Sequence, residues 1–564
     1  MKLNRKLWIS TIACVITGNF VFTSLHAQEN GAVEEFLEKP LEIHGNFSVN
    51  AQYYNEDSTI GAPKVPEQML TNGFANVIIT KGVFSAGVRY ESYRNPVLGF
   101  DPRYKGSGFP YRYLQFKQDG LDVTAGNFYE QFGTGLILRA YEERDLGVDN
   151  AFDGIRVKYS TKFGVYVKGL IAKQRYFFNL GPGIVRGVDG LVVMNELIKP
   201  FEDSKFKVKV GGSLVSKYQE DDNPNYKLPE NVASMAGRLN LSYEGFSFLG
   251  EYAYKMNDPS SDNGFLYNPG QALYLSGTYS QRGLGINVSA KSIDNMSYRS
   301  DRNEGLNNLL ISYNPALTKQ HTYNLAATLY PYASQLTGEV AYQADVVYKI
   351  KKGSALGGKY GTTLIVNAAK SFGLDSTHVN DLTTTRQGYT TNFFTPGQTE
   401  YYQDINVTVE RKMVKWFKLK AMYMNLMANN DILKYGGLNG SWSGKIYADI
   451  AVLDLLFKLN SKHSIRTEIQ GLWSKQDMGD WGTFIAEYTF SPHFFVAIMD
   501  QYNYGNPIEA NQIHYPYGSV GYTNKSNRIS IGYGRQKAGL FCVGGVCRVV
   551  PASNGLTISV TSSF

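Results

Sequence analysis

The chain has few of the residues that build metal centres. Among its 564 residues are three cysteines, Cys14, Cys542 and Cys547, and seven histidines. No histidine lies two or four positions from another, which excludes the paired-histidine spacing of zinc motifs. We therefore predict neither a metal centre nor a cofactor.

The chain also lacks a long apolar run and a strong excess of one charge. After the N-terminal region, no stretch offers about 20 consecutive apolar residues, so no transmembrane helix is predicted. The formal net charge is only +7, and Lys2, Arg5 and Lys6 supply three of the positive charges. Such a small excess does not indicate a nucleic-acid partner.

The N-terminus is typical of an export signal. An apolar stretch from Leu7 to Phe22 follows the basic residues, and small residues precede a cleavage site after Ala27. We predict a signal peptide over 1–27. The alternative is a retained membrane helix, although the apolar run is short and interrupted. Cys14 lies inside that run, so it does not indicate a lipid anchor.

Aromatic residues and glycines are abundant: the chain has 41 Tyr, 31 Phe and 57 Gly, with a mean hydropathy of -0.27. Apolar and polar residues alternate along many segments, as in "FSFLGEYAY" (246–254), 284–291 and 205–214. Successive side chains of a strand point to opposite faces, so each such segment has one apolar and one polar face.

These segments are about ten residues long, and tight turns alternate with longer polar loops between them. Tight turns are predicted at 81–82, 119–120, 161–162, 244–245 and 281–283. Long loops are predicted at 55–70, 94–109, 218–229, 258–270 and 294–318. This alternation is typical of an outer-membrane β-barrel, because only a closed barrel satisfies every strand amide in lipid.

We predict an all-β fold, a single-chain transmembrane antiparallel β-barrel over 41–564, with about 24 strands in a range of roughly 22–26. Residues 28–40 are expected to form a periplasmic N-terminal segment, which is too short for the plug domain of a TonB-dependent transporter. A soluble β-sandwich would need several domains and linkers, and a solenoid would need a short repeat; neither is visible. The strand count is least defined over 350–400.

The final segment, 556–564, alternates in the same way and ends at Phe564. This end resembles the signal by which the barrel-assembly machinery recognises its clients, and we expect the last strand to pair with the first. The loop before it contains "CVGGVC" and is expected at the outer rim. Because an exported protein meets an oxidising compartment, we predict a Cys542–Cys547 disulfide; the alternative is a dithiol that binds metal or exchanges.

Two segments carry a family resemblance: "QFGTGLILRAYEERDLGVDNAFDGIRV" (131–157) and "GLFCVGGVCRVVPASNG" (539–555). Together they resemble a Bacteroidota outer-membrane family of unassigned function, DUF6029, and the likeness covers most of the chain after the leader. The resemblance implies an outer-membrane location and assigns no site residue. It is also compatible with an accessory role in the type IX protein export of that phylum.

The densest charge cluster lies within 139–156. Its members are Arg139, Glu142, Glu143, Arg144, Asp145, Asp149, Asp153 and Arg156. On an inward loop or strand end they could form a pore constriction that selects solutes by charge. The alternative is a set of salt bridges that brace the lumen wall. Lys205, Lys207 and Lys209 would also face the lumen, either to attract anions or to neutralise lumen acids.

No motif indicates catalysis. "GSALGGKYG" (353–361) nearly matches a P-loop, but Tyr360 stands where Ser or Thr would bind magnesium, so a turn is predicted. His378 and His514 are the candidates for a Ser/His or Asp/His site at the rim. We predict a non-enzymatic barrel in the lipid bilayer, either a porin-like pore for hydrophilic solutes or an accessory barrel for secretion or surface assembly.

The mature protein should begin at Gln28. Because export removes a signal peptide, intact-mass measurement of protein from outer membranes should give the mass of residues 28–564. A mass that includes 1–27 would show instead that the N-terminus is retained.

Overall fold

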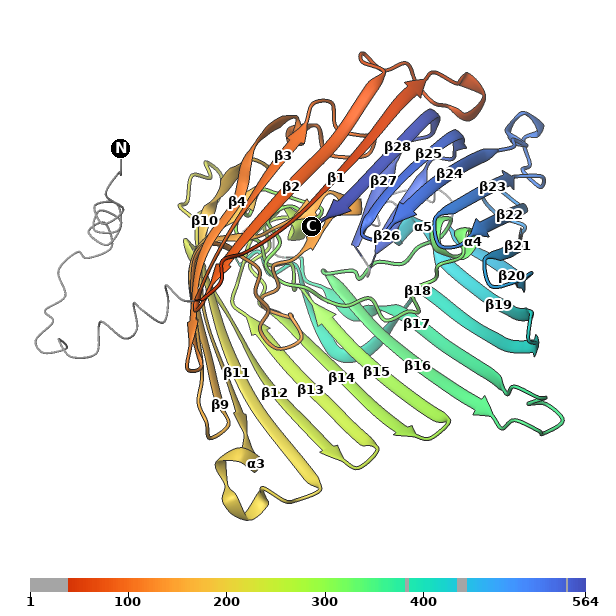
Figure 1. The fold of residues 1–564 in the computed structure, drawn as a ribbon. Helices are drawn as coiled ribbons and strands as arrows, with labels where there is room; N and C mark the ends of the chain where they lie inside the picture. The colour runs from red at the N-terminus through yellow and green to blue at the C-terminus, as the bar shows by residue number, and fades with distance from the viewer. Residues whose placement is uncertain (1–38, 381–384, 434–443, 544–545) are drawn as a thin grey trace, which may run out of the picture.

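A computed structural model describes residues 39–380, 385–433, 444–543 and 546–564. The predicted signal peptide and nearly all of the predicted N-terminal segment 28–40 lie outside these residues. The described chain forms one sheet of 24 strands, each antiparallel to its neighbours (Figure 1). The first strand, β1 (Glu42–Asn55), pairs with β2 (Met69–Lys81) on one side and with the last strand, β28 (Ser553–Ser563), on the other. The sheet is therefore a closed barrel, and the predicted strand number is confirmed.

The other barrel strands follow one another in chain order around the wall. They are β3 (Phe84–Tyr93), β4 (Gly106–Gln118), β5 (Leu121–Phe128), β8 (Phe152–Ser160), β9 (Val165–Tyr176), β10 (Asn179–Val193), β11 (Phe206–Tyr218), β12 (Asn231–Tyr243), β13 (Phe246–Lys255), β14 (Gly270–Gln281), β15 (Leu284–Asp294), β16 (Gly338–Ile350), β17 (Thr362–His378), β18 (Tyr389–Val414), β19 (Phe417–Asn429), β20 (Lys445–Lys458), β21 (His463–Ser474), β22 (Trp481–Phe490), β23 (Phe494–Tyr502), β24 (Tyr517–Asn524) and β25 (Asn527–Gln536).

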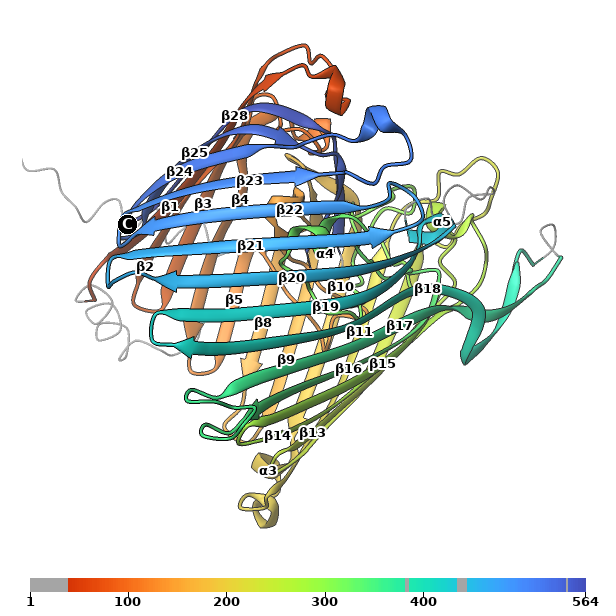
Figure 2. The same ribbon diagram turned by 90° about the vertical axis from the view of Figure 1, so that its right-hand side faces the viewer.

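The two rims of the barrel differ, as Figure 2 shows. At one rim, here called the short-turn rim, the five predicted tight turns all join consecutive strands, and 353–361 forms part of a further turn there. β1 begins and β28 ends at this same rim. The opposite, long-loop rim carries the predicted long loops. In barrels of this kind the short turns are periplasmic and the long loops extracellular.

The helices of the described residues are short. They are η1 (Ser58–Ile60), η2 (Pro102–Tyr104), η3 (Arg144–Leu146), α3 (Met194–Leu197), η4 (Lys199–Phe201), η5 (Ser261–Asn263), α4 (Asn324–Thr328), α5 (Asn430–Leu433) and η6 (Glu509–Asn511). In the part of the chain described, none is long and apolar enough to span a membrane.

The outer face of the wall is apolar. In β13 the alternating aromatic residues Phe246, Phe248 and Tyr252 are 59%, 38% and 42% exposed, whereas Glu251 and Ala253 are buried on the inner face. Large apolar side chains are exposed in the same alternating way on nearly every strand around the barrel. Such a surface is stable in hydrocarbon and not in water, so the barrel spans a membrane.

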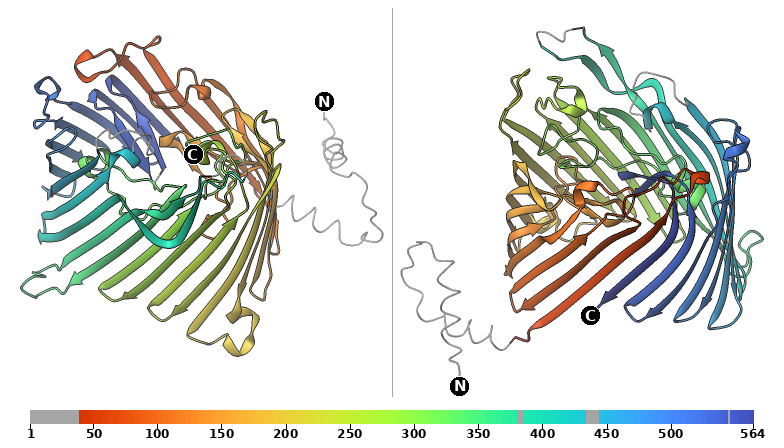
Figure 3. Two further views of the ribbon diagram at one scale, coloured as in Figure 1. Left: turned by 180° about the vertical axis from the view of Figure 1, so that it is seen from behind. Right: turned by 90° about the horizontal axis from the view of Figure 1, so that it is seen from above.

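Three connections from the long-loop rim fold into the barrel (Figure 3). The first inward segment, 129–151, contains η3 and the two short strands β6 (Glu142–Glu143) and β7 (Val148–Asp149). The second inward segment, 295–337, contains α4. It extends well beyond the predicted loop 294–318, because its apolar residues pack against the wall instead of facing water.

The third inward connection is a hairpin of β26 (Gly539–Val543) and β27 (Val546–Val550). Its backbone contacts α4 and η3, so it reaches into the barrel, contrary to the expected place at the outer rim. The strand register places Cys542 opposite Cys547, at a spacing that suits a disulfide. Their side chains lie outside the described part of the structure, so the disulfide stays a prediction.

Removing Phe564 should impair barrel assembly. Phe564 exchanges two backbone hydrogen bonds of 2.9 Å with Gly45 of β1, and its ring lies where a side chain at position 45 would stand. Deletion of Phe564, or Gly45→Leu, should reduce the folded band in heat-modifiability gels, because each disturbs the closing strand pair. Phe163→Ala, in a turn at the same rim, is the control. Normal folding of the deletion would argue against a terminal assembly signal.

Candidate functional site

The lumen is the candidate functional site, and its own inward segments fill part of it. The first inward segment contributes the fully buried Phe132, Ile137 and Leu138 to an apolar cluster. Met296 and Tyr298 of the second inward segment join the same cluster. Small wall residues make room for them: Ala172, Ala236, Ala253 and Ala272. The sector of wall from β8 to β15 is therefore covered by packed side chains.

Hydrogen bonds hold the two inward segments to each other and to the wall. The Arg139 amide donates to the Ile311 carbonyl at 2.8 Å, and the Tyr298 hydroxyl donates to the Val232 carbonyl of β12, also at 2.8 Å. The Thr134 amide donates to the carboxylate of Glu251 in β13 at 2.7 Å. Because these groups are buried, the contacts define one position for each segment.

A second apolar cluster covers the opposite sector of the wall. Residues 323–332, which include α4, pack on inner residues of β18 to β22 such as Met424, Leu472 and Trp481. Beside this cluster His321 lies 2.7 Å from Asp404, and the Lys319 ammonium donates to Asn406 at 2.9 Å. Burial lowers the pKa of Lys319, although Asp404 acts in the opposite direction.

The predicted charge cluster lies partly in the first inward segment and partly on β8. Two of its acids meet two buried arginines of the wall: Arg89 of β3 binds Glu142 at 2.8 Å, and Arg175 of β9 binds Asp149 at 2.6 Å. Glu91 of β3 completes the network, 2.9 Å from Arg175. The five side chains form a dry network, in which both arginines are below 10% exposed.

The other predicted residues lie around this network. Arg144 pairs with Glu142 at 2.6 Å, and the Arg139 guanidinium lies 3.9 Å from the Tyr313 ring centroid. On β8, Asp153 pairs with Arg112 at 2.9 Å and Arg156 donates to Thr124 at 2.8 Å.

Two carboxylates of the first inward segment titrate differently. Partial burial raises the pKa of Glu143, and the nearby Asp145 and Glu142 raise it further. The pKa of Glu130 lies below its usual range. Burial acts to raise this pKa, but ion pairs with Lys158 at 2.6 Å and Lys168 at 3.0 Å outweigh the effect of burial.

Sequence reasoning identified the acids of the network and missed its arginines. Arg89, Glu91 and Arg175 come from strands distant in the sequence. A signal was present, since charged residues at positions 89 and 91 share one face of the strand, opposite the face that carries Val88 and Tyr90. The buried pairs fit the bracing alternative for Glu142 and Asp149. Arg144 and Asp145 are the exposed members of the cluster, and Glu143 is half-buried, so these three can meet a solute.

A third sector of the lumen wall is polar and accessible. The inner residues of β1, β24, β25 and β28 line a cavity of about 360 Å³ beside the hairpin. Asn50, Ser519, Arg528, Ser530, Thr557 and Ser559 contribute polar groups to it. Asn50 and Arg528 are exposed to this space.

The histidine candidates do not converge on this cavity. His378 ends β17, and His514 lies 2.6 Å from Asp500 while stacking on Tyr502 at the long-loop rim. Within the described ranges, no three His, Cys, Asp or Glu side chains are grouped to hold a metal ion. The absence of enzymatic activity stays a prediction.

A closed 24-stranded barrel with an apolar outer face and a polar inner wall is a transmembrane β-barrel of the outer-membrane type. The chain belongs to DUF6029, a family of unknown function, whose model matches residues 4–564.

Solved structures with similar folds are outer-membrane receptors and porins. The siderophore receptor PirA from Pseudomonas aeruginosa is 11% identical, with a TM-score of 0.39 over 93% of this chain and 80% of that one. The outer membrane protein OpdK from the same species is 9% identical, with a TM-score of 0.31 over 71% and 96%. At these TM-scores the likeness carries no argument about function. No curated protein matches the sequence.

Replacing Arg175 should destabilise the barrel. Arg175→Met leaves Glu91 and Asp149 buried with one arginine fewer, which costs about 3–5 kcal/mol in the free energy of unfolding. Arg144→Met, at an exposed ion pair, should cost about 1 kcal/mol or less. Urea unfolding in lipid vesicles, followed by tryptophan fluorescence, measures both. Equal losses in the two variants would contradict a buried bracing network.

Proposed function

We propose that the barrel is a non-enzymatic, porin-like pore for small hydrophilic solutes, whose route its own inward segments narrow. The observation that carries the proposal is the polar sector of β1, β24, β25 and β28. Its inner side chains, Asn50 and Arg528 among them, are exposed to a cavity in the lumen. A wall that had only to support packed loops would not need exposed polar groups along this sector.

The solute-selecting part of the predicted constriction is then η3 and its neighbours. Glu143, Arg144 and Asp145 lie where the first inward segment contacts the hairpin. Fixed charges at a narrow place select solutes by charge as well as size. Glu142 and Asp149 support this place through their ion pairs with Arg89 and Arg175.

The second candidate is an accessory barrel that does not conduct and serves type IX secretion or surface assembly. The observation that favours it is the firm attachment of both inward segments. The second inward segment binds the wall through His321 and Asp404 on one side, and through Tyr298 and Val232 on the other. A lumen filled this way could act as scaffold alone. In either case the barrel-assembly machinery is the partner expected at the β1–β28 seam.

Conductance across planar bilayers distinguishes the two candidates. The wild-type barrel should give discrete single-channel steps, and replacing 300–333 with a short Gly-Ser linker should enlarge them, since it removes most of the second inward segment. The control replaces 222–227, in the loop between β11 and β12 at the same rim. A silent wild type with a conducting variant would favour the accessory candidate, and silence of both would exclude a pore.

Ion selectivity should depend on pH through Glu143. Burial and neighbouring acids raise the pKa of Glu143, so its negative charge is present above that raised pKa and is lost as the pH falls through it. Cation preference should therefore weaken on acidification in the wild type and remain constant in Glu143→Gln. Reversal potentials in a salt gradient measure this. An identical pH response in both proteins would place the selecting charge elsewhere.

A further inference from the structure

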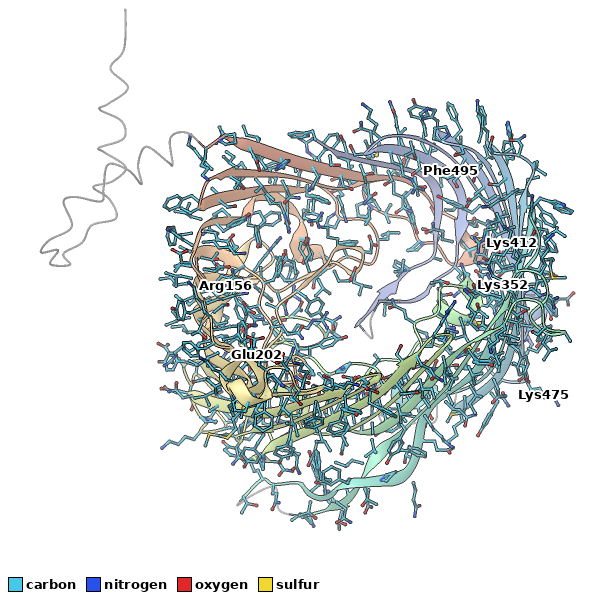
Figure 4. All side chains as sticks on the ribbon, turned by 60° about the horizontal axis from the view of Figure 1, so that its bottom comes forward. Arg156, Glu202, Lys352, Lys412, Lys475 and Phe495 are labelled. Atoms are coloured by element: carbon cyan, nitrogen blue, oxygen red, sulfur yellow. The ribbon has the colours of Figure 1, made fainter. Side chains whose placement is uncertain are left out.

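Most turns of the short-turn rim from β14 to β25 carry positive charge. We call this set of turns the basic arc. Its exposed members, all in turns between strands, are Arg282, Lys351, Lys352, Lys359, Lys415, Lys462 and Lys525. Lys352, labelled in Figure 4, lies in the connection between β16 and β17, which is part of this arc.

The turns of this sector contain no acid: 282–283, 351–361, 415–416, 459–462, 491–493 and 525–526 have neither aspartate nor glutamate. Elsewhere the charges are mixed. The connection 194–205 at the same rim carries Glu196, Glu202 and Asp203, and the long loop 219–230 at the opposite rim is mainly acidic. The basic arc is therefore a local feature and not a consequence of overall composition.

Exposed aromatic rings near the short-turn rim indicate how deep the basic arc lies in the membrane. Phe417 stacks on Phe457 with ring centroids 4.9 Å apart, and Trp416 lies against the same ring. Farther along, Phe494 and Tyr522 pack together, also at 4.9 Å, and both are exposed on the outer face. Such rings lie at the level of the lipid headgroups. Because the lysines lie only a few residues from these rings, their ammonium groups reach the depth of the lipid phosphates.

We propose that the basic arc binds anionic phospholipid headgroups in the leaflet around the short-turn rim. The ammonium and guanidinium groups carry positive charge, which attracts the phosphates of the headgroups. No acid in these turns competes with the phosphates for the cations. The proposal does not depend on whether the lumen conducts. It gives the barrel an interaction surface on its outer circumference, separate from the lumen site.

An apolar groove continues the arc and fits an acyl chain. The groove lies on the outer face of β11 to β15, has a volume of about 580 Å³, and is lined by residues that include Phe246, Tyr279 and Val288. A Cβ at Gly277, which also lines the groove, would meet no atom within 4 Å. Arg282, in the turn between β14 and β15, stands at its rim end. One phospholipid can thus place its phosphate at Arg282 and a chain in the groove.

Lipid titration followed by native mass spectrometry tests the proposal. The purified wild-type barrel should bind phosphatidylglycerol in preference to phosphatidylcholine, and high salt should reduce the preference. The variant K351Q/K352Q/K415Q/K462Q should bind phosphatidylglycerol about tenfold more weakly. The control K64Q/K105Q/K227Q/K475Q removes four exposed lysines from the long-loop rim and should match the wild type. Heat-modifiability first establishes that each variant is folded.

A second variant tests the groove. A Cβ at position 277 meets no atom, so Gly277→Leu should extend into the groove, weaken binding of long-chain phosphatidylglycerol and leave the dihexanoyl form unaffected. Retention of the anionic preference in the arc variant, or equal losses in arc and control variants, would overturn the proposal. Capture of an acidic protein by the wild type alone, with unchanged lipid binding, would overturn it in favour of a protein partner.

Discussion

The structure depends on the need to satisfy every backbone amide of a strand in hydrocarbon, where water cannot do so. The pairing of β1 with β28 meets this need at the only place where the sheet would otherwise have two open edges. The apolar alternation of the strands follows from the same constraint, because the outer side chains replace contacts with water by contacts with lipid. Because the number of antiparallel strands is even, the barrel begins and ends at the same rim.

A barrel of 24 strands encloses more space than its inner side chains fill, so segments from the long-loop rim fold inward and occupy part of the lumen. The first and second inward segments do this with apolar side chains that face small wall residues, such as Ala236 and Ala253. Many of the buried charged groups inside are paired, as with Arg175 and Asp149. The inward segments cover the other sectors of the wall. A solute in the lumen can therefore contact the polar wall around Asn50 and Arg528.

The charged groups of the short-turn rim are arranged differently from those in the lumen. Inner charges are paired because the lumen wall and the inward segments exclude water from them. The lysines of the basic arc remain unmixed with acids over a large part of the short-turn rim, next to a girdle of aromatic rings. The lumen and the lipid-facing rim can therefore carry separate interactions on one barrel, one with solutes and one with headgroups.

The sequence by itself determined the fold, because two-residue alternation such as that of 246–254 reports directly which side chains face lipid. It also located the acids Glu142 and Asp149 and the closing strand that ends at Phe564. It could not show that 295–337 and the hairpin turn inward, since a loop over water and a loop in a lumen have similar compositions. Only the tertiary structure joined Arg89 and Arg175 to those acids, because the first inward segment folds against wall strands that are far from it in the chain.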